Sequence, residues 1–244
     1  MSDGAHYTEQ FFRNQAERSL ASARVIAPHV MDLLRPSKIV DVGCGVGAWL
    51  KAFHDLGVQT FRGMDGDYVS REQLLFDAQS FQPCNLARPE PIVTGYDLCL
   101  CLEVAEHIPA RASRSLIKML VSAAPLVLFS AAIPGQGGTS HVNEQWPRYW
   151  TRLFEERGYL RLDPFRRIIA NDEGVDWWYR QNLYLFASAE SIKESAILRR
   201  ELELARMSQI DYIGINVLAK YSTVRGLATQ FSRAVWRAIR GRVC

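Results

Sequence analysis

Apolar positions follow two different periods along this chain of 244 residues. Short apolar runs are typical of strands, and apolar residues recurring every three to four positions are typical of helices. Helical spacing predicts helices at 1–35, from about 48 to 56, at 111–122 and at 146–157, with a helix or irregular segment at 69–77. The apolar runs predict strands at 38–42, 59–64, 80–84, 96–102, 126–130, 159–169 and 178–187. This alternation predicts an α/β fold, with a doubly wound, mostly parallel seven-stranded sheet and helices on both faces.

The pattern divides the chain into three parts. They are an N-terminal helical cap at 1–35, an α/β domain at 36–188 and a helical extension at 189–244. Residues 7–12 of the cap either cover a ligand as a lid or pack onto the edge of the sheet. From 220 to 244 there are six basic residues and no acidic ones, on an amphipathic pattern. Such a helix suits an anionic membrane surface, and the alternative is docking on its own domain or on a partner subunit.

Composition narrows the class of protein. A hydrophobic content of 48% supports a sizeable core, and a net charge of +3 is too small to indicate nucleic acid as the main partner. The five cysteines show no C-x-x-C spacing, and Cys99 and Cys101 are expected to pack as small hydrophobes. The N-terminus resembles neither a signal peptide nor a membrane span. We therefore expect a cytoplasmic protein, with peripheral attachment at the inner face of the membrane as a variant.

The first candidate site is a glycine-rich turn between the first strand and its helix. Asp41 ends the strand, and Gly43, Gly45 and Gly47 follow at alternate positions. Glycines let a ligand approach the backbone closely, and the free N–H groups of the following helix face that ligand. A carboxylate here would repel the pyrophosphate of a dinucleotide but suits the ammonium group of S-adenosylmethionine (SAM). The turn therefore favours SAM over NAD.

Two further acidic features follow at later strand ends. Asp65 lies after the second strand, roughly 20 residues past the glycines, where a carboxylate can bind ribose hydroxyls. The fourth strand ends in Glu103, Glu106 and His107. In an open parallel sheet, ligands bind beyond the carboxyl ends of the strands, so we expect these side chains to face the same ligand.

Together these residues resemble the class I SAM-dependent methyltransferases, which have a Rossmann-like fold, over about residues 36–187. The resemblance implies that Gly43, Gly45 and Gly47, behind Asp41, hold the methionine end of SAM and that Asp65 holds its ribose. It places Glu103 and His107 beside the methionine portion and the substrate. It also assigns the adenine contact to the segment containing Asn85 and Leu86, where Asn85 replaces the aspartate of many family members and its amide oxygen still accepts a hydrogen bond.

The second candidate site is the glycine-rich loop from 131 to 145, after the fifth strand. Its polar side chains, followed by aromatic residues, suit a polar, ring-shaped acceptor with hydroxyls, such as a sugar. A second aromatic and polar group, 176–182, is expected to approach from the seventh strand. Core packing is the alternative for Trp146 and Trp178. The predicted substrate contacts are Asn143, Trp146, Tyr149 and Arg180.

Methyl transfer to a hydroxyl benefits from a general base, and histidine is the best suited because its pKa lies near neutrality. His141 is preferred because it lies on the acceptor loop, His107 is the second candidate, and Glu144 orients or assists. His107 has the alternative role of capping a helix. A divalent-metal site formed by His141, Glu144 and Glu103 is an alternative, but nothing in their spacing requires one, and we expect no metal.

The sequence thus predicts a SAM-dependent methyltransferase acting on a hydroxyl of a sugar, glycan or small metabolite. The acceptor loop resembles that of methyltransferases of bacterial polysaccharide and secondary-metabolite pathways. Two alternatives are a nicotinamide-dependent oxidoreductase and a non-catalytic SAM-binding scaffold whose tail recruits partners or membrane.

Overall fold

The computed structural model describes residues 9–89 and 94–207, without the side chains of 9–15. Part of the predicted lid, 7–12, and all of the basic segment 220–244 therefore lie outside what is described. No helix within the described ranges is long and apolar enough to cross a membrane.

Within these described ranges, seven strands form one sheet in the order β3-β2-β1-β4-β5-β7-β6. The strands are β1 (Lys38–Val42), β2 (Thr60–Asp65), β3 (Phe81–Pro83), β4 (Leu98–Leu102), β5 (Leu126–Ser130), β6 (Tyr159–Leu162) and β7 (Tyr184–Ser188). The pairs from β3 to β5 are parallel, and β7 runs antiparallel to both β5 and β6. The predicted fold class, a mostly parallel seven-stranded sheet, is confirmed.

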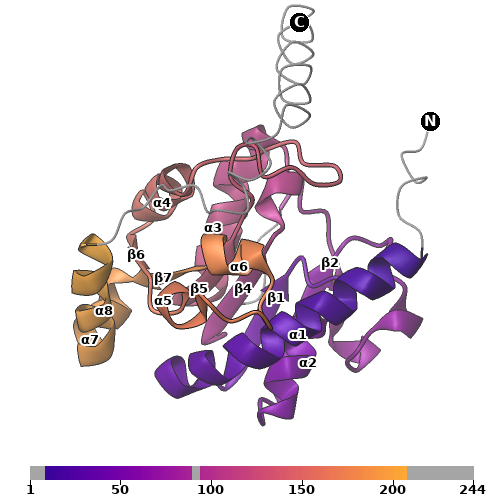
Figure 1. Ribbon diagram of the computed structural model, residues 1–244, viewed down its shortest axis with the longest axis horizontal. Helices are drawn as coiled ribbons and strands as arrows, with labels where there is room; N and C mark the ends of the chain where they lie inside the picture. The colour runs from indigo at the N-terminus through magenta and orange to yellow at the C-terminus, as the bar shows by residue number, and fades with distance from the viewer. Residues whose placement is uncertain (1–8, 90–93, 208–244) are drawn as a thin grey trace, which may run out of the picture.

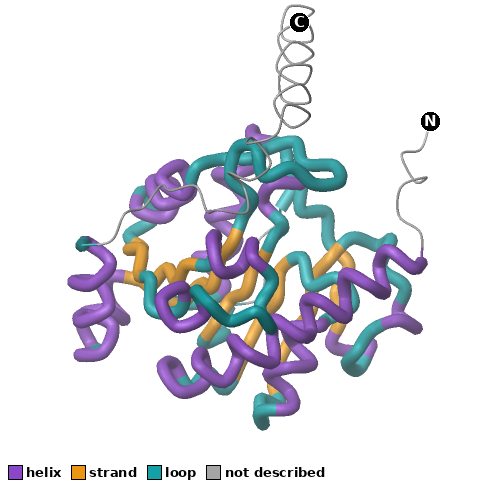
Figure 2. The backbone as a smooth tube through the Cα atoms, in the orientation of Figure 1, coloured by secondary structure: helices purple, strands orange, loops and turns teal. Residues whose placement is uncertain are grey.

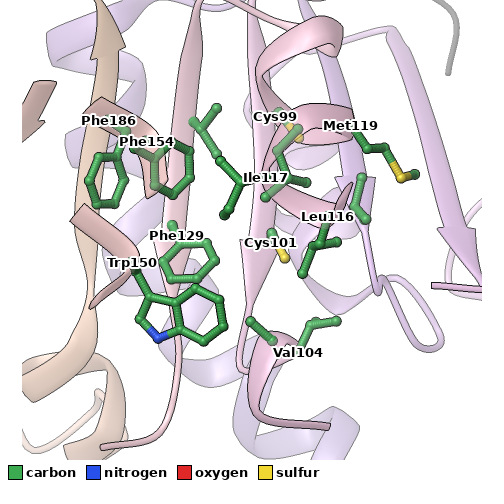
Figure 3. Close-up of a cluster of buried hydrophobic side chains, with 14 of the residues drawn as sticks. Cys99, Cys101, Val104, Leu116, Ile117, Met119, Phe129, Trp150, Phe154 and Phe186 are labelled. Carbon is green, nitrogen blue, oxygen red and sulfur yellow. The ribbon is translucent and has the colours of Figure 1, made fainter. Parts of the chain in front are cut away.

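Helices cover both faces of the sheet (Figures 1 and 2). The helices are α1 (Glu9–Leu34), α2 (Ala48–Asp55), α3 (Ser113–Ala123), α4 (Pro147–Glu155), α5 (Arg166–Ile169), α6 (Trp177–Asn182), α7 (Ala189–Glu194) and α8 (Ala196–Arg206). The sheet has a hydrophobic core on each face. Because side chains alternate along a strand, Cys99 and Cys101 of β4 lie in one core and Leu98 and Leu100 lie in the other. The first core packs against α3 and α4 (Figure 3), and the second against α1, α2 and α6.

Two predicted elements are wrong. Residues 178–182, expected to open the seventh strand, belong to α6, because Tyr179 packs on Trp49 of α2 and Asp176 pairs with Arg18 of α1. These tertiary contacts override the β propensity of the aromatic residues. The predicted strand 159–169 ends at Leu162, shortly before Pro164, which has no N–H for the ladder. The segment 69–77, expected to be helical or irregular, is irregular apart from the short turn η1 (Arg71–Gln73), and η2 (Ala78–Ser80) follows it.

The helices directly after β7, in the predicted extension, pack on the sheet. Leu198 and Ala205 of α8 are buried, and Arg161 of β6 donates a hydrogen bond to the Ala205 carbonyl at 3.1 Å. The described part of the extension, up to residue 207, is therefore helical and attached to the edge strand β6.

Candidate active site

The carboxyl ends of β1, β2, β4 and β5 meet at one edge of the sheet, as parallel pairing requires. Carboxylates concentrate there. Asp41 and Asp65 belong to β1 and β2, and Glu103 and Glu106 follow β4. A site lined with so much potential negative charge favours a cationic ligand over a phosphate.

The glycine-rich turn after β1 depends on its glycines in two ways. Gly43, Gly45 and Gly47 have φ values of +85°, +53° and +88°, in the left-handed region that side chains rarely adopt. A Cβ on Gly43 would lie 2.3 Å from Val104 Cγ2, and one on Gly47 would lie 2.2 Å from the Phe76 ring. Only glycine therefore permits both the turn and its close packing.

Asp41 and Asp65 lie together behind this turn but differ in their hydrogen bonds. The Asp65 carboxylate accepts from the Gly45 and Gly66 amides, at 2.7 and 2.6 Å, and from the Tyr68 hydroxyl. Asp41 is only 2% exposed, and its Oδ2 has no hydrogen-bond partner among the described residues. Burial, with the nearby Asp65 charge, raises the pKa of Asp41 to about 8. The unsatisfied carboxylate and the open glycine turn fit a ligand that carries an ammonium group, as SAM does.

The predicted adenine segment follows β3. Asn85 is exposed, and its side-chain oxygen accepts a hydrogen bond from the Ala87 amide at 3.0 Å, which closes a local turn. Leu86 is buried against the core on the α3 side of the sheet. One lone pair of the Asn85 oxygen is therefore already used within the turn.

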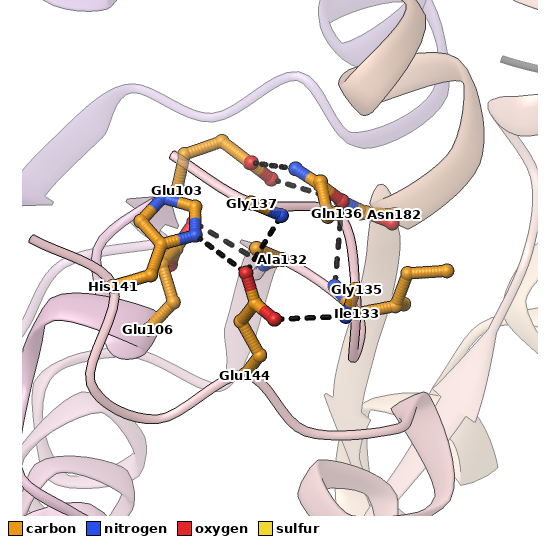
Figure 4. A network of polar contacts seen from close by, with 10 residues as sticks. All are labelled: Glu103, Glu106, Ala132, Ile133, Gly135, Gln136, Gly137, His141, Glu144 and Asn182. Carbon is orange, nitrogen blue, oxygen red and sulfur yellow. Dashed lines mark hydrogen bonds and ion pairs between the residues drawn. The ribbon is translucent and has the colours of Figure 1, made fainter. Parts of the chain in front are cut away.

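Glu103, directly after β4, is held in an unusual conformation. Its φ is +56°, and its amide donates to the carbonyl and hydroxyl of Ser130, at 3.0 and 3.1 Å. Its carboxylate accepts from Gln136 Nε2 at 3.2 Å and Asn182 Nδ2 at 3.4 Å. Gln136 comes from the acceptor loop and Asn182 from the end of α6, so two segments far from Glu103 in the sequence hold its carboxylate (Figure 4). A backbone strained in this way is typical of functional sites.

The sequence does not indicate a role for Gln136 or Asn182. Both lie in polar segments, but neither has a recognisable spacing from Glu103. Glu106 is recognisable at the end of the fourth strand, but the sequence does not indicate what it does there.

Glu144 organises the acceptor loop. Its carboxylate accepts from the Gly135 and Gly137 amides at 2.8 and 2.7 Å and bonds to His141 Nδ1 at 3.1 Å (Figure 4). Burial opposes ionisation, but the hydrogen bonds from His141 and the two amides lower the pKa of Glu144 below its ordinary value. Glu144 is therefore anionic, and Nδ1 of His141 donates the proton of their hydrogen bond.

The two predicted histidines meet. The ring centroids of His107 and His141 lie 4.9 Å apart, edge to face. His107 belongs to the short turn η3 (Ala105–His107) and has one exposed side, while desolvation of the rest and the neighbouring His141 lower its pKa. The structure thus brings both candidate bases to one place, from segments more than 30 residues apart.

Glu106, the residue before His107, binds the acceptor loop through both its backbone and its side chain. Its backbone carbonyl accepts from the Val142 and Asn143 amides, each at 2.9 Å, and its Oε1 accepts from the Ala132 amide at 3.2 Å. The carboxyl group is fully buried, and its burial beside Glu103 raises its pKa well above the ordinary value. The loop is therefore held by hydrogen bonds to the backbone and to the side chain of Glu106.

The predicted substrate contacts have different surroundings. Asn143 is buried, and its Nδ2 donates to the Ala105 carbonyl at 3.3 Å and to Ser113 Oγ at 3.0 Å, so it anchors the loop. Trp146 and Tyr149 are half-buried at the start of α4. Arg180, on α6, is also half-buried, and its Nε has no partner among the described residues.

Comparisons with known proteins agree with this geometry. Residues 12–167 match the family model described as "Methyltransferase domain". No curated protein matches the sequence.

Several solved structures share the fold. The methyltransferase domain of bacterial CtHen1 is 19% identical, with a TM-score of 0.51 over 68% of this chain and 97% of that one. Magnesium protoporphyrin IX methyltransferase from Synechocystis, solved with bound SAH, is 18% identical, with a TM-score of 0.50 over 77% and 90%. A Nostoc punctiforme protein assigned as an O-methyltransferase is 16% identical, with a TM-score of 0.55 over 77% and 63%. The chain spans 57% of the length of two others, TnmH and LaPhzM.

Proposed function

Because this chain belongs to the methyltransferase-domain family, with SAM as its cofactor, we propose that it methylates a hydroxyl oxygen of a sugar, glycan or small metabolite. SAM supplies a methyl group on a positively charged sulfur. The observation that carries the proposal is the histidine pair, His107 and His141, which lies at the same sheet edge as the glycine turn. The Nostoc punctiforme relative, assigned as an O-methyltransferase, supports oxygen as the acceptor atom.

In this proposal the cofactor lies along the β1–β2 edge. Gly43, Gly45 and Gly47 hold its methionine end, and Asp41 offers its unsatisfied oxygen to the ammonium group. Asp65 takes the ribose with the lone pairs that its internal hydrogen bonds leave free, and Asn85 with Leu86 flanks the adenine. Glu103, fixed by Gln136 and Asn182, separates the methionine end from the acceptor.

The histidine pair activates the acceptor hydroxyl. In the direct form of this step, Nε2 of His141 takes the hydroxyl proton while the oxygen bonds to the methyl group. Glu144 stabilises the imidazolium that forms, because it is anionic and already bonded to Nδ1. His107 is the second candidate for the base, and its lowered pKa keeps it neutral and able to accept.

The acceptor itself is proposed from the residues around the loop. Trp146 and Tyr149 offer flat surfaces for a ring, and Arg180 offers a donor that the described residues do not use. Asn143 acts on the substrate through the loop that it anchors.

The test is a methyl-transfer assay that detects S-adenosylhomocysteine, run over sugars, glycans and small hydroxylated metabolites. We expect His141→Ala to lower turnover by about 10²–10⁴-fold, the usual contribution of a general base, with SAM affinity unchanged. His54→Ala, an exposed histidine on α2, is the matched control. If turnover is untouched in both His141→Ala and His107→Ala, the histidine role is wrong. SAM binding without methyl transfer to any acceptor would indicate the scaffold alternative.

A further inference from the structure

We propose that Glu106, His107 and His141 hold a divalent transition-metal cation beside the acceptor oxygen. One ligand atom from each of the three residues lies within 4.8 Å of the others. A cation bound at about 2.0–2.2 Å from each ligand needs those atoms about 3–4 Å apart. Small side-chain rotations therefore close the site, although sequence spacing did not indicate one.

Both histidines are already oriented as metal-binding histidines usually are. A metal-ligating histidine donates its other ring N–H to a carboxylate or a backbone carbonyl, which fixes the ring and raises its basicity. His141 does so to Glu144, at 3.1 Å, and His107 is hydrogen-bonded to the backbone of Ser140. Each ring therefore has one nitrogen held by the protein and one left for a cation.

Glu106 is the independent observation that indicates a ligand. It is 0% exposed, its Oε2 receives no N–H or hydroxyl donor among the described residues, and its carboxyl group lies within hydrogen-bond reach of that of Glu103. A buried carboxylate oxygen without a partner is unfavourable, and the adjacent carboxylate of Glu103 makes it more so. A divalent cation gives the Glu106 oxygen a partner and offsets the repulsion between the two carboxyl groups, while Glu103 stays bonded to Gln136 and Asn182.

The donor set selects the kind of ion. Imidazole nitrogens favour first-row transition metals, whereas sites for Mg²⁺ and Ca²⁺ are built mainly from oxygens. Two imidazoles with one carboxylate therefore indicate an ion such as Mn²⁺, Co²⁺ or Zn²⁺, with positions left for an oxygen of the acceptor.

The cation changes how the hydroxyl is activated, and this part of the inference rests on the proposed function. A nitrogen that binds a cation cannot take a proton, so His141 is a ligand in the metal-bound protein. The cation lowers the pKa of the coordinated hydroxyl, whose proton leaves to water. The carbon–oxygen bond then forms as the carbon–sulfur bond breaks, and the sulfur keeps the electron pair.

Metal binding is measured without any acceptor. The full chain, dialysed against EDTA and then freed of it, is titrated with Mn²⁺ and separately with Co²⁺ by calorimetry, with Mn²⁺ also followed by electron paramagnetic resonance. We expect one ion per chain. Glu106→Gln and His107→Ala should each weaken binding at least tenfold, and Glu144→Gln by about 10–100-fold through His141. His107 is exposed, so its variant leaves the core intact if Glu106→Gln fails to fold.

His54→Ala is the control and should bind as the wild type does. The proposal is overturned if neither ion binds stoichiometrically, or if binding is equal in wild type and His107→Ala. SAM affinity and methyl transfer are measured on the same samples. Metal binding without methyl transfer contradicts the proposed function alone, and full methyl transfer in EDTA contradicts only the part of the cation in activating the hydroxyl.

Discussion

The cofactor end and the acceptor end of the site are built in different ways. The centre of the cofactor end is contiguous, since β1, the glycine turn and α2 occupy residues 38–55, and Asp65 and Asn85 join it from the next two strand ends. The acceptor end is assembled from the β4 terminus, the loop after β5 and the end of α6, and its groups are side chains in one hydrogen-bonded network. A contiguous turn is recognisable from a short motif, whereas a side-chain network depends on the whole fold.

The carboxylates at the two ends also behave in opposite ways. Asp41 lies behind the glycine turn with an unpaired oxygen, and its pKa is raised to about 8. Glu144 receives donors from two amides and a histidine, and its pKa is lowered. At the cofactor end, Asp41 therefore has an oxygen left for a cationic ligand. In the acceptor loop, the charge of Glu144 is already compensated by its three donors.

The largest expected effect concerns the charge on Asp41. Between its ordinary pKa of 3.8 and the raised value of about 8, the folded protein keeps a proton that the unfolded chain has lost. The free energy of unfolding of SAM-free protein should therefore fall as pH rises through this range, by several kcal/mol. Asp41→Asn should remove that part of the slope, measured by urea denaturation across pH. An equal slope in wild type and variant would contradict it.

Next is the steric demand of the glycine turn. Gly43→Ala places a Cβ 2.3 Å from Val104 Cγ2 at a φ of +85°, so we expect a loss of about 3 kcal/mol in stability and at least tenfold weaker SAM binding. Gly45→Ala is the matched control, because a Cβ there meets nothing within 4 Å. Gly45→Ala should lower the free energy of unfolding by only about 1 kcal/mol, the cost of the left-handed backbone conformation. Equal losses in the two variants would show that packing on Val104 is unimportant.

At the acceptor end, Asn143→Ala removes the anchor of the loop and leaves the Ala105 carbonyl and Ser113 hydroxyl without this donor. We expect about 2 kcal/mol of lost stability and slower methyl transfer, with SAM affinity unchanged. Val142→Ala, at a neighbouring residue that is 64% exposed, should change neither. If SAM affinity falls together with turnover, the two ends are not independent.

The smallest effect is expected from Gly138→Ala. A Cβ on this exposed glycine would lie 2.3 Å from His141 Nε2, so the ring must move, and turnover should fall about tenfold without loss of thermal stability. Thr139→Ala, in the same exposed stretch, serves as the control. Unchanged turnover in Gly138→Ala would mean that the position of His141 is not critical.

The elements that the sequence predicted well are those with a local cause. The buried runs of β1, β4 and β5 are apolar on both sides because helices cover both faces of the sheet, and the glycine turn is required by its own backbone angles. The residues of α6 have the pattern of a strand but form a helix, because their conformation depends on contacts with α1 and α2. The pattern of its own residues could not reveal those contacts.

By itself, the sequence determined the sheet, the family and the cofactor turn, because strand burial and glycine conformation are decided by residues close together in the chain. Only the tertiary structure decided that His107, His141 and Glu106 meet, that Gln136 and Asn182 hold Glu103, and that Asn143 anchors the loop. Those contacts join segments 30 to 80 residues apart. Hydrogen-bond and metal geometry act over a few ångströms in space and leave no fixed spacing along the chain.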